Sequence, residues 1–325
     1  DPQGAIWFAT WAGGISRIDP ASGHIETWNN AAPAPTSLSS TNVISLMVDH
    51  SGVLWAGTFD AGANLVMPYG SAFEHHAYDV TRAANGGLVW PMVWAFAEGP
   101  DGAIWVGTQR GMNRYDAQLG RADVYLSDGG RCSGLGLGRD VRAILPEGER
   151  LLWLALADGG LVRLDPETCQ HRIWRKELTT ATRARLLLRD KQGMLWVGTD
   201  KGLNRLDPAS GQVTHYTAQG QPGSLPHNRI RSLYQDAQGT LWVGTSGGLS
   251  RWEPPAQETG GAGQFTTWRA ADGLLSDNDV RAIHRDEDGI LWLATGMGLT
   301  RLDLEQRRAR FFYEKQGLSN NTLYT

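Results

Sequence analysis

The chain has 325 residues, including 41 Gly, 14 Trp and only 2 Cys, and its 30 basic and 34 acidic side chains leave a net charge of −4. The balanced charge excludes a protein that tracks a nucleic-acid backbone, and the low Cys count excludes a scaffold held by many disulfides. No apolar run approaches the roughly 18 residues of a membrane span, so we expect no membrane contact within this chain.

A five-residue phrase centred on Trp recurs seven times. Its copies are Ile6–Thr10, Leu54–Thr58, Ile104–Thr108, Leu152–Leu156, Leu195–Thr199, Leu241–Thr245 and Leu291–Thr295. The seven tryptophans stand 43 to 50 residues apart. A repeat of this period indicates an array built from one supersecondary unit.

Each repeat has the same internal order, which is clearest near the C-terminal end. An extended run at 280–286 and a turn at 287–289 precede the Trp run, and a Gly-containing turn, a run at 299–303 and an aromatic run at 310–313 follow it. Four short runs separated by Gly, Asp and Asn turns indicate a four-stranded antiparallel meander. Seven such units predict an all-β fold, a seven-bladed β-propeller.

The two ends of the chain complete each other. Residue 1 stands just before a Trp strand, so the first blade lacks its innermost strand. The segment 317–325 is similar to the start of an innermost strand at 275–281. We expect residues 321–325 to pair beside the strand at 5–10 and so to close the ring, which would remove exposed sheet edges. We expect residues 1–325 to form a single propeller domain, excised from a larger protein.

Three phrases carry a resemblance to a known family. Leu-Trp-Val-Gly-Thr at 195–199, Gly-Leu-Asn-Arg-Leu-Asp at 202–207 and Gly-Leu-Ser-Asn-Asn at 317–321 resemble the two-component-regulator propeller repeat, over essentially the whole chain. The resemblance implies the periplasmic or extracytoplasmic sensor domain of a bacterial histidine kinase or diguanylate cyclase receptor, with a downstream signalling domain as partner. Two departures stand out: 60–65 lacks the usual Gly-Leu-x-Arg, so that turn should differ, and Leu156 replaces the usual Thr.

The loop before each innermost strand and the turn after each second strand should open on one face, where ligands bind near the axis. Aligned blades place equivalent residues one step into each innermost strand: Ile44, Trp94, Arg142, Arg185, Arg231, Arg281 and Tyr324. Arg forks bind carboxylates and sulfates, and aromatic rings stack on sugars. The set predicts a pocket for an anionic or carbohydrate ligand. The alternative is a structural ladder in which each Arg pairs with carboxylates or carbonyls between blades.

The turns after the Trp strands differ from one another in sequence. These differences indicate either a rim of residues that recognises a ligand or ordinary variation at solvent-exposed positions. The irregular segment 81–96 places Trp90 in a loop and Trp94 in a strand, where the pair would stack on a ligand or plug the axial channel. The candidate ligand-binding residues are Trp11, Asp60, Trp90, Trp94, Arg110, Arg142, Asp158, Arg185, Lys201, Arg231, Arg281 and Tyr324. We expect a small-molecule or oligosaccharide ligand and no nucleic acid.

We expect no cofactor, metal or catalytic residue in the chain. The histidines are dispersed without metal-ligand spacing, and the Gly-rich stretch at 134–138 lacks the helix that a phosphate loop requires. Seven-bladed lyases similar to the streptogramin lyases share a Trp-containing repeat, but only His227 and His284 could serve as acid or base, and no carboxylate pairs with either in the sequence. A protein-interaction propeller is the other alternative.

The two cysteines fall on opposite faces of the predicted blades. Cys132 should lie in a loop on the ligand face, and Cys169 at a turn on the other face. A strand of about six residues separates these faces by roughly 20 Å, whereas a disulfide needs Cα atoms within about 7 Å. We therefore expect no disulfide, although the resemblance implies an oxidising compartment.

Overall fold

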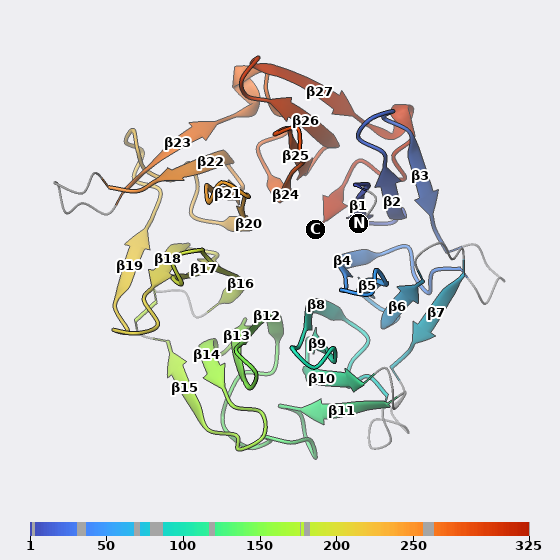
Figure 1. The fold of residues 1–325 in the computed structure, drawn as a ribbon, viewed down its shortest axis with the longest axis vertical. Helices are drawn as coiled ribbons and strands as arrows, with labels where there is room; N and C mark the ends of the chain where they lie inside the picture. The colour runs from blue at the N-terminus through green and yellow to red at the C-terminus, as the bar shows by residue number, and fades with distance from the viewer. Residues whose placement is uncertain are drawn as a thin grey trace. The chain divides into compact units, whose positions relative to one another are not determined.

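The computed structural model describes residues 1, 4–30, 37–67, 72–78, 87–116, 121–175, 177–178, 183–255 and 263–324. The strands form seven four-stranded antiparallel sheets, the blades of a seven-bladed β-propeller (Figure 1). The predicted all-β fold is therefore confirmed. Two short 3₁₀ turns, Ala270–Asp272 and Glu314–Gln316, are the helical elements of the described part, where no helix has the length and apolarity of a membrane span.

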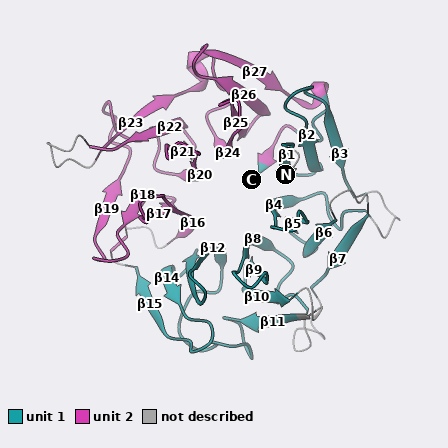
Figure 2. Ribbon diagram, viewed as in Figure 1, with its two compact units in different colours: residues 1–175, 317–320, 324 teal, residues 176–316, 321–323, 325 magenta. Residues whose placement is uncertain are grey.

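The chain forms two compact units (Figure 2). Unit 1 comprises residues 1–175, 317–320 and 324. It contains β1 (Ile6–Thr10), β2 (Gly14–Ile18) and β3 (Ile25–Trp28) of blade 1, whose remaining strand β28 (Leu323–Tyr324) has Tyr324 in this unit and Leu323 in unit 2. It also contains blade 2 with β4 (Val43–Val48), β5 (Leu54–Thr58), β6 (Ala63–Val66) and β7 (Phe73–His76). It also contains blade 3 with β8 (Val93–Glu98), β9 (Ile104–Thr108), β10 (Gly111–Asp116) and β11 (Arg121–Tyr125), and blade 4 with β12 (Val141–Glu147), β13 (Leu151–Leu156), β14 (Gly160–Leu164) and β15 (His171–Trp174).

Unit 2 comprises residues 176–316, 321–323 and 325. It contains blade 5 with β16 (Ala184–Arg189), β17 (Leu195–Thr199), β18 (Gly202–Leu206) and β19 (Val213–Tyr216), and blade 6 with β20 (Ile230–Gln235), β21 (Leu241–Thr245), β22 (Gly248–Glu253) and β23 (Gln264–Trp268). Blade 7 has β24 (Val280–Arg285), β25 (Leu291–Thr295), β26 (Leu299–Asp303) and β27 (Arg308–Phe312).

Both ends of the chain contribute to blade 1, as the sequence predicts. The C-terminal strand β28 lies beside β1 as the fourth strand of that sheet. The Ser319 hydroxyl is 3.0 Å from the Thr10 hydroxyl and 2.8 Å from the Ser16 hydroxyl, so the segment before β28 is also fixed to this blade. Pairing of β28 satisfies the edge of β1 that would otherwise be open.

The Trp-centred phrase forms the second strand of each blade and is deeply buried. In β5, β9, β17, β21 and β25 every residue is buried. The Gly in this phrase lets the first strand of the next blade approach closely: a Cβ on Gly57 would lie 2.8 Å from the Val93 carbonyl oxygen, and one on Gly244 only 2.3 Å from that of Val280. A larger side chain there would force these blades apart.

The remaining letters of the repeat also have structural roles. The Thr at the end of the phrase closes the next turn, as where the Thr58 hydroxyl donates to the Gly62 carbonyl at 2.8 Å. The Arg of Gly-Leu-x-Arg lies opposite the Trp, so that the Arg205 guanidinium is 5.6 Å from the centre of the Trp196 ring. Blade 2 lacks this Arg: Leu65 faces Trp55, on which His76 stacks at 6.3 Å.

An Asp six residues before the Trp fastens five of the blades, a feature that our sequence analysis missed. Each of these carboxylates accepts a hydrogen bond of 2.7 to 3.0 Å from the indole Nε1. The pairs are Asp1–Trp7, Asp49–Trp55, Asp190–Trp196, Asp236–Trp242 and Asp286–Trp292. Burial alone would raise the pKa of Asp49 and Asp236, but the hydrogen bonds outweigh it and lower both pKa values. Gly99 and Glu147 occupy this position in blades 3 and 4.

The two cysteines form a disulfide, so the expectation of unbridged thiols was wrong. The Cα atoms of Cys132 and Cys169 are 5.2 Å apart. The error came from assuming that the connection after β11 stays on one face. Instead the chain folds back: the Leu126 N–H donates to the Arg131 carbonyl, and the Arg131 N–H donates to the Val124 carbonyl, at 3.0 and 2.9 Å. This fold-back carries Cys132 along β11 to the turn after β14.

Candidate functional site

Each first strand of blades 2 to 7 contains a β-bulge at the aligned position. The pairing with the second strand shifts across Ile44, Trp94, Arg142, Arg185, Arg231 and Arg281. A bulge leaves one residue out of the ladder and redirects its side chain, which is why bulges are common beside binding sites. The sequence alignment of the blades therefore identified one geometrically equivalent residue in six strands.

The turns after the second strands lie beside these bulges. The Phe59 N–H donates to the Asn42 carbonyl, the Ala157 N–H to the Asp140 carbonyl and the Gly296 N–H to the Asp279 carbonyl, each at 2.9 Å. Each of these bonds joins the turn to the residue just before the first strand of the same blade. We name this end of each blade the bulge face and describe it separately in the two units.

In unit 1 the bulge face carries a continuous row of aromatic rings. The centre of the Trp11 ring is 5.9 Å from that of Tyr324 and 5.1 Å from that of Phe59, and the Phe59 ring is 6.5 Å from that of Trp94. Phe59 is 37% exposed, which is unusual for a large apolar side chain in this protein. At the end of the row the Arg142 guanidinium covers the Trp94 ring at 3.6 Å, a close cation–π contact.

The same end of the row has buried polar atoms with no protein partner. Arg142 pairs with Asp140 through one bond of 2.6 Å. The Arg142 Nε, the second oxygen of Asp140 and the Trp94 Nε1 are buried without a hydrogen bond to the protein. Buried polar atoms are nearly always paired, so three without a protein partner make this end of the row a candidate site.

In unit 2 the bulge residues of blades 6 and 7 share one carboxylate. Asp279 accepts two hydrogen bonds from Arg231, at 2.6 and 2.8 Å, and one from Arg281 at 2.9 Å. The Ser246 hydroxyl adds a bond of 2.9 Å, and Arg281 also donates to the Leu323 carbonyl at 3.1 Å. Burial acts to raise the pKa of Asp279, but the two guanidinium groups outweigh it and lower the pKa. Two guanidinium groups therefore share this carboxylate, and a second carboxylate, that of Asp277, lies beside it and accepts the Asp279 N–H at 2.8 Å, so the cluster is rich in arginine but balanced in charge.

A second basic cluster of unit 2 surrounds Asp200. Arg185 and Arg229 lie 3.1 and 3.7 Å from this carboxylate, and the exposed Lys201 is the next residue. The Arg185 Nε and one Asp200 oxygen are buried without a protein hydrogen bond. Two guanidinium groups against one carboxylate make this cluster attractive to anions.

The other candidate residues take separate places. The Trp90 indole donates to Gln109 at 3.1 Å, and the Arg110 guanidinium covers its ring at 4.0 Å, with no contact to Trp94 recorded among the described residues. Asp60 and Asp158 are exposed. Residues 81–86 of the Gly-rich segment lie outside the described residues.

The side chains considered for catalysis or metal binding are not gathered into a site of that kind in the described part of the chain. Within the described ranges, no three His, Cys, Asp or Glu side chains gather as a metal site requires. The His227 Nδ1 accepts the Arg229 backbone N–H at 2.9 Å, and the His284 ring packs 5.9 Å from that of Tyr234. Neither histidine is paired with a carboxylate by a hydrogen bond in the described structure.

The sequence analysis did not identify the carboxylates that hold the arginines. Asp140 precedes Arg142 by two residues, and Asp279 precedes Arg281 by two. This Asp-x-Arg spacing was visible in the sequence and would have predicted the pairs, because residues two apart in an extended chain lie on the same side. Only the structure shows that Asp279 also binds Arg231 of the preceding blade.

Comparison with known proteins agrees with the repeat. The family model for the two-component regulator propeller matches residues 37–60, 224–247 and 274–297, which confirms the resemblance at these three segments. No curated protein matches the chain.

Solved structures show the same fold at low identity. The extracellular domain of BT3049 from B. thetaiotaomicron, assigned to a hybrid two-component system, is 18% identical with a TM-score of 0.60, over 98% of this chain and 52% of that one. PorZ, a surface component of the type-IX secretion system of Porphyromonas gingivalis, is 18% identical with a TM-score of 0.67, over 95% and 46%. The computationally designed Ika8 protein is 13% identical with a TM-score of 0.57, over 98% and 86%. The chain thus spans about half the length of the two natural structures.

Proposed function

We propose that this chain, which carries two-component regulator propeller repeats, is the non-catalytic ligand-binding sensor domain of an extracytoplasmic bacterial receptor. Its two units would together form one propeller domain, and a downstream signalling domain would receive the signal. Signalling requires that the ligand favour one arrangement of the sensor and its neighbour over another.

The proposal rests on the unpaired buried atoms of the bulge face. In unit 1, Trp94 and Arg142 each present a buried N–H and Asp140 a buried carboxylate oxygen, without a protein hydrogen bond. In unit 2, Arg185 and Asp200 present the same two kinds of group. Sugar hydroxyls both donate and accept hydrogen bonds, so a carbohydrate can satisfy both kinds of group. The aromatic row of unit 1 adds faces on which a sugar ring can stack.

The charge of unit 2 favours a carbohydrate that bears an acidic group. The cluster at Asp200 holds two guanidinium groups against one carboxylate, and at Asp279 two guanidinium groups converge on one carboxylate. Arginine forks bind carboxylates and sulfates through two hydrogen bonds, which gives direction as well as attraction. The arginine pairs also fit the structural-ladder alternative, and the experiment below separates the two.

The contacts of the two candidate histidines, His227 and His284, favour a binding function over catalysis. An acid–base pair would need a titratable group within hydrogen-bond reach of a substrate proton. The His227 Nδ1 already accepts a backbone N–H, and the candidate face presents arginines and aromatic rings instead.

Thermal unfolding with a uronate disaccharide tests the proposal. A ligand that binds only the folded chain raises the thermal midpoint by mass action, because at one hundred times Kd it adds about 2.7 kcal/mol to the free energy of unfolding. We expect digalacturonate to raise the midpoint of the wild-type chain more than lactose does. The double variant Arg231→Ala/Arg281→Ala should lose this rise, while Arg308→Ala, which removes an exposed cation from β27, should keep it.

The outcome also discriminates the alternatives. If digalacturonate raises the thermal midpoint of the folded Arg231→Ala/Arg281→Ala variant as much as that of the wild-type chain, the two arginines belong to the structural ladder and do not bind the ligand. The absence of a rise with uronates, sulfated sugars and neutral sugars would favour the protein-interaction function instead.

A further inference from the structure

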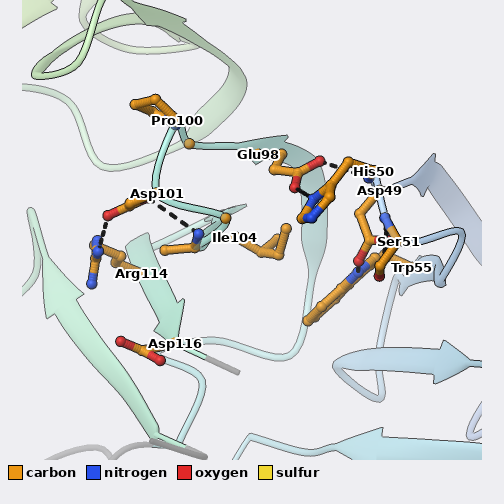
Figure 3. Close-up of a pocket in the computed structure, with 13 residues that line it drawn as sticks. Asp49, His50, Ser51, Trp55, Glu98, Pro100, Asp101, Ile104, Arg114 and Asp116 are labelled. Carbon is orange, nitrogen blue, oxygen red and sulfur yellow. Dashed lines mark hydrogen bonds and ion pairs between the residues drawn. The ribbon is translucent and has the colours of Figure 1, made fainter. Parts of the chain in front are cut away.

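The carboxylates at the other end of blades 2 and 3, away from the bulges, are held by neighbouring side chains. A cavity of about 880 Å³ lies there within unit 1, between the turn after β4 and the turn after β8 (Figure 3). Three carboxylates that line it each contact a side-chain nitrogen of the protein, in the pairs Glu98–His50, Asp49–Trp55 and Asp101–Arg114. These contacts stay within blades 2 and 3, whereas an arginine of the bulge face in unit 2 contacts the C-terminal strand β28.

This arginine, Arg281 of β24, holds β28 by its backbone. The Arg281 Nη1 donates to the Leu323 carbonyl at 3.1 Å, and the Arg281 Nε donates to the Asp279 carboxylate at 2.9 Å. All three residues belong to unit 2. The guanidinium therefore lies between the carboxylate that fixes it and the strand that it holds.

The bond to Leu323 is a substantial part of what holds β28, because the strand is short. In the described structure β28 spans only Leu323–Tyr324, so its ladder with β1 is short. Leu323 is completely buried and the Arg281 side chain is 18% exposed, so water competes weakly for the bond. A charged donor also makes a stronger hydrogen bond than a neutral one. Loss of this bond should therefore loosen β28 more than it would loosen a longer strand.

A carboxylate bound at the bulge face of unit 2 would give this guanidinium a second anchor. Arg231 binds the same Asp279 at 2.6 and 2.8 Å, so both arginines converge where the acidic group of the proposed ligand would lie. A guanidinium has five N–H donors, so Arg281 can bind a ligand while its Nε serves Asp279 and its Nη1 serves Leu323. Anchored by Asp279 and by the ligand, the Arg281 side chain can no longer turn away from the Leu323 carbonyl.

We propose that Arg281 couples ligand binding at the bulge face of unit 2 to the attachment of β28. This coupling rests on the proposed function, in which an acidic carbohydrate binds Arg231 and Arg281. The ligand favours the arrangement in which β28 is held, and without the ligand the strand separates from Arg281 more often. In a receptor of the kind proposed above, the chain that follows β28 leads to the downstream signalling domain, so this strand transmits the state of the site.

Hydrogen exchange, read by mass spectrometry on the peptide that covers 317–325, tests the attachment without ligand. Arg281→Ala should speed exchange in this peptide by about fivefold or more, because each opening of β28 then breaks one bond fewer. The matched variant Arg231→Ala removes the other guanidinium on Asp279 but keeps the bond to Leu323, so it should change the rate by less than about twofold. An Arg281→Ala chain that exchanges here like the wild-type chain, or like Arg231→Ala, would overturn the proposal.

Saturating digalacturonate then tests the coupling, with calorimetry on the same samples to show that it binds. We expect this ligand to slow exchange of the 317–325 peptide in the wild-type chain by about threefold or more beyond any slowing at β27, which lies in unit 2. Lactose should leave both peptides unchanged. Binding of digalacturonate without this extra slowing would overturn the coupling and leave the proposed function standing. The absence of binding would overturn the proposed function and the coupling together.

Discussion

The Asp–Trp pairing makes a strong prediction about stability, most clearly at Asp236. Its side chain is 1% exposed and accepts four hydrogen bonds. The donors are the backbone N–H groups of Gln238 and Thr240, at 3.1 and 2.8 Å, the Trp242 indole at 3.0 Å and the Arg285 guanidinium at 2.8 Å. The substitution Asp236→Ala would leave all four donors without this acceptor.

The cost follows from the donors left behind. Each neutral bond contributes about 1 kcal/mol and the bond to Arg285 somewhat more, so the free energy of unfolding should fall by about 4 kcal/mol. With an unfolding entropy of about 2.1 cal/mol/K per residue, the midpoint should fall by about 6 °C. Differential scanning calorimetry measures this shift directly.

A matched control lies in the corresponding turn of blade 7. Asp288 is exposed and has no recorded contact in the described part, so Asp288→Ala should change stability by no more than about 0.5 kcal/mol. A loss below about 1 kcal/mol in Asp236→Ala, or equal losses in the two variants, would refute the assignment of Asp236 as a fastener of its blade.

Three further predictions follow from the fold. Trp196→Phe should destabilise the chain by about 1 kcal/mol more than Trp105→Phe, because only the Trp196 indole bonds to a buried Asp; urea unfolding of both variants checks this, and equal losses would contradict it. Intact mass should show alkylation of Cys132 and Cys169 only after reduction, and alkylation before reduction would contradict the disulfide. Because the two cysteines are 37 residues apart, reduction should lower the free energy of unfolding by up to about 4 kcal/mol. Asp49, Asp236 and Asp279 have folded pKa values below the ordinary 3.8, so the stability they contribute is complete above that value and is lost as pH falls through the folded values. Chemical unfolding between pH 5 and 2 should show this loss, with a shallower slope in Asp236→Ala; an unchanged slope would contradict it.

The fold could be predicted from the sequence because each blade repeats the same residue pattern and forms the same set of strands. The Trp phrase predicted the buried second strands, and the similarity of 317–325 to 275–281 predicted the shared blade of the two termini. Alignment of the blades even located the bulges, at residues such as Arg231 and Arg281, before any strand register was known.

The features that were not predicted from the sequence depend on an irregular connection between blades and on the packing of one blade against the next. The segment 126–140 folds back on β11 through backbone hydrogen bonds that no residue pattern signals, and so the Cys132–Cys169 disulfide was not predicted. The sharing of Asp279 by two blades depends on blade packing and was equally hidden. By contrast, the Asp six residues before the Trp in five blades was readable from the sequence, as was its replacement by Gly99 and Glu147 in blades 3 and 4.

The central claim is that the bulge face binds an acidic carbohydrate through its arginines. Titration calorimetry of digalacturonate into the wild-type chain and into Arg231→Ala/Arg281→Ala tests it most directly. The account predicts saturable binding to the wild-type chain and at least tenfold weaker binding to the folded variant. Identical affinities in the two proteins, or no binding to the wild-type chain, would contradict it.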